Sequence, residues 1–262
     1  MARRAAALGV AAVAATAAVL AAGTGADDPR RTDLAVAGAL PAPVAPAFTP
    51  GPPHRLGARR HRSLWAPVKR PAAVRSAPDG GAPTIGMLEP TTPEGTRNVV
   101  AVAARGEDRA GRRWVRVRLA VLPNGTTGWV PRAALGGYAT VTTHLVVDRG
   151  ALTATLLRAG RRVLRAPVGI GTAAAPTPAG EFFVRNRLTR FRSPFYGPIA
   201  FGTSARSAVL TDWPGGGFVG IHGTDRPDLV PGRVSHGCIR MRNADILRLA
   251  RAMPVGTPIT IR

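Results

Sequence analysis

The sequence predicts a mainly β protein in which two β domains follow one another and a short helix lies near the end of the second. Three observations support this fold class. Apolar residues alternate with arginines over residues 114–119, which is the period of a half-buried strand. Strand-like segments separated by turn residues recur between residues 139 and 168. Convincing helical periodicity is confined to the residues after Asn243.

Residues 1–26 have the composition of an export signal. Met1-Ala2-Arg3-Arg4 supplies a positive start, residues 5–22 are uncharged and rich in alanine and valine, and small residues suited to cleavage follow. The mature chain is therefore expected to be extracytoplasmic, either secreted or associated with the cell wall in the periplasmic space. A membrane partner is expected only if the signal is not cleaved, because its roughly 18 weakly apolar residues would then tether the chain.

Residues 27–62 are rich in Pro, Gly, Ala and Arg and show no apolar period, which predicts a semi-extended linker. The full sequence has a formal net charge of +22, part of which reflects an arginine-rich composition. Such a charge creates a long-range potential that favours anionic surfaces, which for an exported protein means anionic wall polymers. No nucleic-acid partner is expected, because the sequence shows no helix-turn-helix, aromatic RNA platform or zinc-finger spacing.

Residues 63–136 are predicted to form a small β domain. Asn124-Gly125 suits a hairpin turn, and residues 128–131 supply the returning strand. The Trp-Val-x-Val and Gly-Trp-Val elements resemble a bacterial SH3-like domain, which implies a small barrel that either binds the wall or acts as a spacer. Trp114 and Trp129 are more typical of its core than of a ligand platform.

Residues 137–262 are predicted to form the second domain. Its expected strands are residues 139–147, 152–158, 161–168, 181–185, 207–211, 218–222 and 258–262. Short turns separate the first three, so they should form an antiparallel meander. A helix is expected with Asn243 as its cap, since apolar residues follow at the spacing i, i+3, i+4 and i+7, and Pro254 ends it.

Cys238 is the only cysteine, which makes it a candidate nucleophile rather than half of an internal disulfide. A thiolate is the reactive form, so an imidazole should lie nearby to accept the proton. No histidine follows Cys238, and two precede it: His222, 16 residues earlier at the end of an expected strand, and His236. Residues two apart in an extended segment face the same side, so His236 could also contact the thiol, and these residues leave the choice open. The amides of Gly237 and Cys238 are candidate oxyanion donors.

Two motifs, Ile221-His222-Gly223-Thr224 and Ser235-His236-Gly237-Cys238-Ile239-Arg240-Met241, resemble the signature of the L,D-transpeptidase family, whose catalytic module is also called the YkuD domain. The resemblance extends over about residues 138–262. It implies a curved β-sheet fold with a C-terminal helix nearby. It also implies that Cys238 is the nucleophile and His222 the proton acceptor, oriented by the backbone carbonyl of Gly223.

The same resemblance assigns supporting roles to four further residues. His236 and Ser235 should shape the pocket, and Tyr196 is a candidate lid or oxyanion residue. Arg240 is a candidate clamp for a substrate carboxylate, since a guanidinium binds one bidentately. An ion pair within the domain is the alternative role for Arg240.

The resemblance implies acyl transfer between peptidoglycan stem peptides. Cys238 would attack the bond after the L-centre of meso-diaminopimelate at the third position and release D-Ala. The thioester would be captured by the side-chain amine of a neighbouring stem, giving a 3→3 crosslink, or by water or a free D-amino acid. No metal or organic cofactor is implied, and a carbapenem should act as a covalent inhibitor. The alternatives are an L,D-carboxypeptidase and a wall-binding protein with an inactive transpeptidase domain.

Other classes fit the residues poorly. Serine D,D-transpeptidases need Ser-x-x-Lys, but the only lysine, Lys69, follows Ala66 at that spacing. Cysteine peptidases of the papain or NlpC/P60 kind place a histidine after the cysteine. Sortases use His, Cys and Arg, but their sequence elements do not resemble the two motifs here. A zinc site built from Cys238 and the two histidines would lack a fourth ligand.

Overall fold

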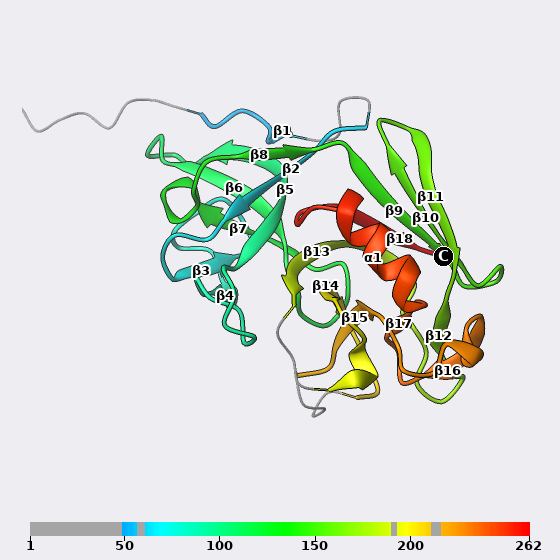
Figure 1. Ribbon diagram of the computed structural model, residues 1–262. Helices are drawn as coiled ribbons and strands as arrows, with labels where there is room; N and C mark the ends of the chain where they lie inside the picture. Colours follow the sequence, from blue (N-terminus) through cyan, green and yellow to red (C-terminus); the bar gives the residue numbers. More distant parts are fainter. Residues whose placement is uncertain (1–48, 57–60, 190–192, 211–215) are drawn as a thin grey trace, which may run out of the picture. The chain divides into compact units, whose positions relative to one another are not determined.

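The structure is a computed structural model that describes residues 49–56, 61–189, 193–210 and 216–262. The predicted export signal and residues 27–48 of the predicted linker lie outside the described residues. Within the described residues, two β-sheets account for most of the regular structure, and the one α-helix lies against the second sheet (Figure 1). No helix among them is long and apolar enough to cross a membrane.

The first sheet has eight strands. Seven of them follow the order β4-β3-β7-β6-β5-β2-β8, and β1 pairs with β5. The strands are β1 (His54–Arg55), β2 (Ser63–Pro67), β3 (Ala72–Arg75), β4 (Thr84–Leu88), β5 (Val99–Glu107), β6 (Arg113–Arg118), β7 (Thr127–Pro131) and β8 (Ala139–Val141). A short 3-10 helix, η1 (Arg132–Ala134), follows β7. Valine and leucine side chains, many of them two residues apart and so on one face of their strand, form its core.

The predicted hairpin is confirmed, since β6 and β7 pair antiparallel. Its connection is longer than a two-residue turn, and only Gly125 of the Asn-Gly pair takes a positive φ, at 89°. Trp114 and Trp129 are buried and pack with Ala104, as expected for core residues. The sheet also extends beyond the predicted boundaries, because β1 lies in the segment predicted as linker and β8 lies after residue 136.

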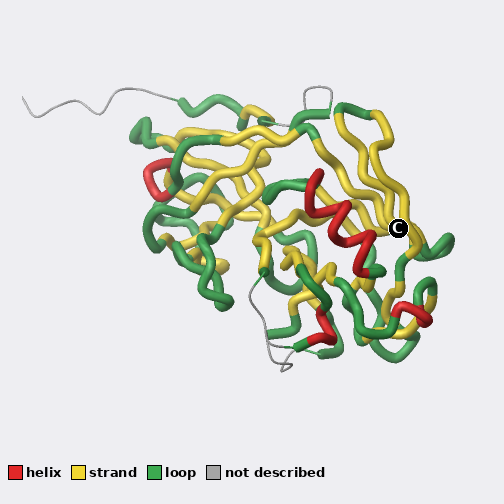
Figure 2. The backbone as a smooth tube through the Cα atoms, viewed as in Figure 1, coloured by secondary structure: helices red, strands yellow, loops and turns green. Residues whose placement is uncertain are grey.

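The second sheet has ten strands in the order β11-β10-β9-β18-β13-β14-β15-β17-β12-β16. They are β9 (Thr143–Asp148), β10 (Thr153–Arg158), β11 (Arg161–Pro167), β12 (Gly169–Gly171), β13 (Gly180–Leu188), β14 (Ala200–Arg206), β15 (Phe218–His222), β16 (Gly232–Ser235), β17 (Ile239–Arg240) and β18 (Pro258–Ile261). Two 3-10 helices, η2 (Pro194–Tyr196) and η3 (Pro227–Leu229), lie in its connections. Figure 2 shows that strands and loops dominate this part of the chain.

The predicted meander is confirmed, because β9, β10 and β11 pair antiparallel in sequence order. Asp148 fixes the first turn by accepting the backbone N–H groups of Gly150 and Ala151. The strand predicted at residues 207–211 is wrong. Ser207 instead forms a turn, in which its Oγ accepts the N–H groups of Val209 and Leu210.

The strand near that position is β14, which the alternation of residue types does not reveal. All of its residues except Arg206 are buried, so apolar and polar residues have no reason to alternate. Small residues dominate it, and only Phe201 is large. A strand buried on both faces therefore went unrecognised, although it lies directly beside β15, which ends at His222.

The predicted helix is confirmed as α1 (Asn243–Ala252), and its apolar residues Ile246, Leu249 and Ala250 are buried in the core of the second sheet. The predicted cap is wrong. Arg242 occupies the cap position, while the Asn243 Oδ1 accepts the N–H of Thr224 at 3.0 Å. Asn243 therefore joins the helix to the loop that follows β15.

Contacts also join the two sheets. The loop between β4 and β5 contacts β13, where Glu94 forms an ion pair with Arg185. Asn124 at the β6–β7 connection both accepts the N–H of Arg206 at 2.9 Å and donates to its carbonyl at 2.8 Å. Arg118 donates to the carbonyl of Glu181 at 2.9 Å. These contacts reach the strands that position the candidate site.

Candidate active site

Cys238 lies in the tight loop between β16 and β17 and is half-buried. Ser235 organises this loop: its Oγ donates to the Cys238 carbonyl at 2.6 Å and accepts the N–H of Gly237 at 3.1 Å. Gly237 has a φ of 114°, a conformation that favours glycine. The loop geometry therefore requires both the hydroxyl and the glycine of the Ser-His-Gly-Cys motif.

Thr177 supports the same loop from another segment. Its buried Oγ1 donates to the Gly237 carbonyl at 2.8 Å and accepts the N–H of Gly171 at 2.9 Å. The Gly237 amide, predicted as an oxyanion donor, is already bonded to Ser235 in this structure. The Cys238 amide remains the candidate donor that the loop offers at the nucleophile itself.

Gly220 brings the thiol and the imidazole to a shared space. Its N–H donates to Cys238 Sγ at 3.3 Å. A Cβ placed on Gly220 would lie 3.8 Å from that sulfur and 3.9 Å from the Cδ2 of His222. The imidazole edge that carries Nε2 is therefore on the same side of β15 as the thiol. Parallel pairing of β15 with β17 explains the approach, because Ile221 is opposite Ile239.

His222 ends β15 and is almost completely buried, at 1% relative exposure. Its Nδ1 lies 2.6 Å from the carbonyl oxygen of Gly223, the contact that the family resemblance implies. A carbonyl can only accept, so Nδ1 carries the proton and Nε2 is left as the acceptor. The buried Nε2 has no hydrogen-bond partner among the described residues. It is therefore available to receive a proton.

Aromatic rings enclose the imidazole. Tyr196 meets the His222 ring edge-on with centroids 4.9 Å apart, and Phe195 lies 5.9 Å away. Both rings, together with His222, His236, Cys238 and Arg240, line a pocket of about 40 Å³. Its remaining lining residues are Ser207, Leu210, Gly217, Phe218, Val219 and Ser235. The structure thus brings Tyr196 and His236 to the thiol's pocket, where His236 is exposed and His222 is buried.

Arg240 is the charged group of this pocket. It is 7% exposed, its Cζ lies 4.5 Å from the centroid of the Phe195 ring, and its buried Nε has no partner among the described residues. No carboxylate in the described part of the chain forms an ion pair with it. The arginine therefore carries a charge in the pocket of Cys238 that no carboxylate of the described residues balances, and a guanidinium in this position can bind an anionic group.

The electrostatics keep both reacting groups neutral at rest. Burial lowers the pKa of His222 to about 4, against the opposing effect of its bond to the Gly223 carbonyl. Burial raises the pKa of the Cys238 thiol, while the Gly220 N–H and the charge of Arg240 act to lower it. A neutral thiol beside a neutral imidazole requires proton transfer during attack rather than a preformed ion pair.

The geometry also offers no cluster for a metal. Across the described residues, no group of three or more His, Cys, Asp or Glu side chains lies close enough to hold an ion. Neither Gly220 nor Thr177 was predicted to contribute to the site. A glycine inside the apolar strand Phe218–His222 is the signal that could have found Gly220, because strand glycines mark close approaches.

A family model of the L,D-transpeptidase catalytic domain, YkuD, matches residues 142–261. Over 122 residues the chain is 36% identical to a Bacillus subtilis (strain 168) protein named as the L,D-transpeptidase YkuD, which covers 47% of this chain and 67% of that protein. The chain belongs to the L,D-transpeptidase family. A second protein of that strain, named as the L,D-transpeptidase YqjB, is 37% identical over 93 residues, covering 32% of this chain and 51% of that protein.

Solved L,D-transpeptidase structures also match. The Enterococcus faecium L,D-transpeptidase C442S mutant is 24% identical, with a TM-score of 0.36 over 46% of this chain and 49% of that chain. The Ldtfm-avibactam carbamoyl enzyme is 27% identical, with a TM-score of 0.36 over 46% of this chain and 48% of that chain. This chain therefore spans about half the length of these two chains. The family model begins at residue 142, so the first sheet lies outside it.

Proposed function

We propose that this protein is an exported peptidoglycan L,D-transpeptidase that forms 3→3 crosslinks between stem peptides through a thioester on Cys238. The observation that carries the proposal is the convergence of three groups on one pocket: the Cys238 thiol, the acceptor edge of His222 and the uncompensated charge of Arg240. Export follows from the composition of residues 1–26, and it would place the site beside the wall.

In the first half-reaction, His222 Nε2 takes the proton of the thiol as the sulfur attacks the carbonyl carbon of the third stem residue, at its bond to D-Ala. The Cys238 amide donates to the oxyanion, and Arg240 holds a carboxylate of the stem peptide. Collapse of the tetrahedral intermediate breaks the C–N bond, and the imidazolium returns its proton to the leaving amine of D-Ala. The acyl group remains on sulfur, so its energy is kept without ATP.

In the second half-reaction, an amine of a neighbouring stem attacks the thioester while His222 accepts its proton. The C–S bond then breaks, the imidazolium returns the proton to the sulfur, and the crosslink forms with the thiol restored. The exposed side of the pocket, where His236 lies, gives an acceptor access without passing the buried His222. If water takes the acceptor's place, the same site is an L,D-carboxypeptidase, and the identity of the acceptor separates these two activities.

The first sheet is proposed to be an SH3-like module that binds the wall or holds the catalytic sheet at a distance from the membrane. Charge supports the wall-binding role, since arginines such as Arg105 and Arg113 line a surface pocket on this sheet together with Trp114. Anionic wall polymers would be attracted to such a surface. Binding of the purified protein to isolated walls, measured against salt, tests this role.

The decisive experiment is muropeptide analysis of peptidoglycan incubated with the purified protein and with its Cys238→Ala variant. The wild type should produce 3→3-linked dimers, and the variant should produce none while keeping its melting temperature, because the thiol is one small group in a pocket. Crosslinking by the Cys238→Ala variant would contradict the proposed thioester intermediate. Released stems without dimers would support the L,D-carboxypeptidase, and no product at all would support the inactive wall-binding protein.

Covalent inhibition gives an independent measurement. The catalytic domain of the E. faecium L,D-transpeptidase has been solved acylated by ertapenem. A carbapenem should therefore add its mass to this protein once, and alkylation of the only thiol beforehand should prevent the addition. A carbapenem mass that still appears after alkylation would contradict acylation of Cys238.

A further inference from the structure

Strand β14 carries a bulge beside the hydrogen-bond donor of the thiol. Gly202 pairs with Gly220, and Arg206 pairs with Phe218, so three residues of β14 lie opposite the single residue Val219 of β15. A bulge interrupts the ladder, and the backbone groups it leaves unpaired must find other partners. The carbonyl of Val219 is such a group.

Thr203 supplies the partner from within the bulge. Its side chain is fully buried, and its Oγ1 donates to the Val219 carbonyl at 2.6 Å. The same oxygen accepts the N–H of Ala205 at 3.1 Å. Because one interaction uses a lone pair and the other uses the hydroxyl hydrogen, the direction of the hydroxyl dipole is fixed.

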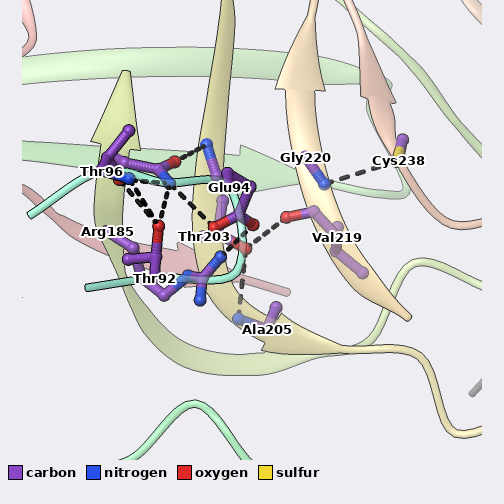
Figure 3. A network of polar contacts seen from close by, with 11 residues as sticks. Thr92, Glu94, Thr96, Arg185, Thr203, Ala205, Val219, Gly220 and Cys238 are labelled. Carbon is purple, nitrogen blue, oxygen red and sulfur yellow. Dashed lines mark hydrogen bonds and ion pairs between the residues drawn. The ribbon is translucent and has the colours of Figure 1, made fainter. Parts of the chain in front are cut away.

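The Val219 carbonyl and the Gly220 N–H belong to one peptide group. That N–H donates to Cys238 Sγ at 3.3 Å. Hydrogen bonds therefore run in one direction from Ala205 through Thr203 and the peptide group to the sulfur, as Figure 3 shows. Hydrogen bonds chained in this way strengthen one another by about 10–30% per bond.

We propose that Thr203 is a positioning residue for the nucleophile: its hydroxyl holds and polarises the Val219–Gly220 peptide group so that the Gly220 N–H stabilises the thiolate of Cys238. The proposal rests on the proposed role of Cys238. When the S–H bond breaks and the proton moves to His222 Nε2, negative charge develops on sulfur, and the Gly220 N–H bond strengthens. Thr203 touches neither the substrate nor the sulfur.

The test is the pH dependence of alkylation of the only thiol by iodoacetamide, followed by intact mass. Thr203→Val keeps the shape and removes the hydroxyl, so the thiol pKa should rise by about half a unit and alkylation near neutral pH should slow about threefold. Thr203→Ser should restore both to wild-type values. Thr257→Val is the matched control, because Thr257 is equally buried and bonded through its hydroxyl to the Pro254 carbonyl. This control should leave the alkylation profile unchanged.

An unchanged profile in folded T203V, or T203S behaving as T203V does, would overturn the proposal, and so would an equal shift in T257V. Should T203V not fold, Thr203→Ala removes the same hydroxyl without adding a methyl group to the bulge. In the wild-type protein, the NMR chemical shift of the Gly220 amide should change with pH as Cys238 titrates. An amide shift that stays constant through this titration would contradict the hydrogen bond from Gly220 to the thiolate. Alkylation needs no transpeptidase substrate, so these outcomes are separate from those of the muropeptide experiment.

Discussion

At the scale of single residues, the main feature of the site is that its thiol and its imidazole are both uncharged. His222 and Cys238 are both held in their neutral forms by burial, and the hydrogen bonds they make do not reverse this. An ion pair of thiolate and imidazolium would place two charges in a desolvated site, where the Gly220 N–H is the donor to the sulfur among the described residues. General-base transfer during attack is therefore the mechanism that this geometry favours.

The two histidines should differ in their effect on acylation by a carbapenem. His222→Ala removes the buried acceptor and should slow acylation by roughly 10²- to 10⁴-fold. His236→Ala removes an exposed side chain at the pocket rim and should slow it far less. Single-turnover rates of mass addition compare the two variants directly. If His236→Ala is the slower by tenfold or more, the proton acceptor is His236.

Burial of His222 also makes folding stability depend on pH. The unfolded chain binds a proton on this residue below about pH 6.5, whereas the folded protein does so only near pH 4. Stability should therefore fall by about 3 kcal/mol as the pH is lowered through this window, and be fully present above it. Denaturant unfolding at a series of pH values measures the slope. In His222→Gln the contribution should disappear, and an unchanged slope would show that the imidazole is not buried neutral.

The chemistry of the candidate site was predictable from residue types because a thiol and an imidazole have few other uses in such motifs. Cys238 and the two histidines became candidates in this way, whereas the choice of His222 as proton acceptor and the role of Arg240 came from the family resemblance and stay predictions. Gly220 and Thr203 were not predicted, since their contributions depend on where a backbone N–H and a bulge lie. Sequence patterns report side-chain chemistry and burial, but not the partner of a single peptide group.

At the scale of elements, strand β15 places the Gly220 N–H and the His222 imidazole beside Cys238, and Gly220 has no side chain to fill the space between them. Val219 and Ile221 point into the core on one side. Gly220 between them leaves the other side open to the thiol and His222. A strand holds these groups more rigidly than a loop would, and its alternation places Gly220 and His222 on the same face.

Gly220→Ala should separate folding from catalysis at this strand. The added Cβ meets nothing closer than 3.5 Å, so the melting temperature should stay close to that of the wild type. It would, however, occupy the space between sulfur and imidazole, where a misplacement of about 1 Å can cost 10²-fold in rate. Acylation rates and melting curves of the variant decide this. Gly86→Ala in β4, where the nearest atom is 4.0 Å away, is the matched strand control.

Elements were predictable where burial is one-sided. β9, β10 and the second half of β6 alternate because one face meets the core and the other is more exposed. β14 is buried on both faces and short β17 lies inside the motif that carries the chemistry, so neither shows a period. Helix α1 was found from its apolar stripe, but its cap was not, because Asn243 serves the loop after β15 instead.

At the scale of the whole described unit, the first sheet supports the wall of the catalytic pocket. Glu94 pairs with Arg185, whose Cζ lies 3.7 Å from the centroid of the Phe218 ring. Arg206 contacts the same ring at 4.3 Å, and Asn124 bonds its backbone. Phe218 lines the pocket of Cys238. A loop of one sheet thereby fixes an aromatic side chain at the site of the other, and Figure 3 shows its ion pair.

Glu94→Gln should destabilise the protein by about 2 kcal/mol, because it leaves the buried Arg185 guanidinium without its carboxylate while Glu94 itself is partly exposed. Although burial alone would raise it, the pKa of Glu94 is lowered by the charge of Arg185 and by hydrogen bonds. The wild-type contribution is therefore present above about pH 4.5 and is lost as the pH falls below it. Denaturant midpoints at neutral and acidic pH measure both effects.

The exposed pair of Arg226 and Asp228 is the control for that experiment. Asp228→Asn should leave the midpoint unchanged. Equal midpoints for Glu94→Gln and the wild type at neutral pH would mean that the contact between the sheets contributes nothing to stability.

The pairing of Glu94 with Arg185 has a consequence for how this architecture can change through evolution. A gene that loses the first sheet leaves Arg185 and the side-chain amide of Asn186 without the acidic loop that satisfies them. Replacement at both positions, or a new acidic residue nearby, would then be favoured in the descendant. Family members that lack a preceding sheet are therefore expected to carry different residues at the positions of Arg185 and Asn186, and those that retain it should vary Glu94 and Arg185 together.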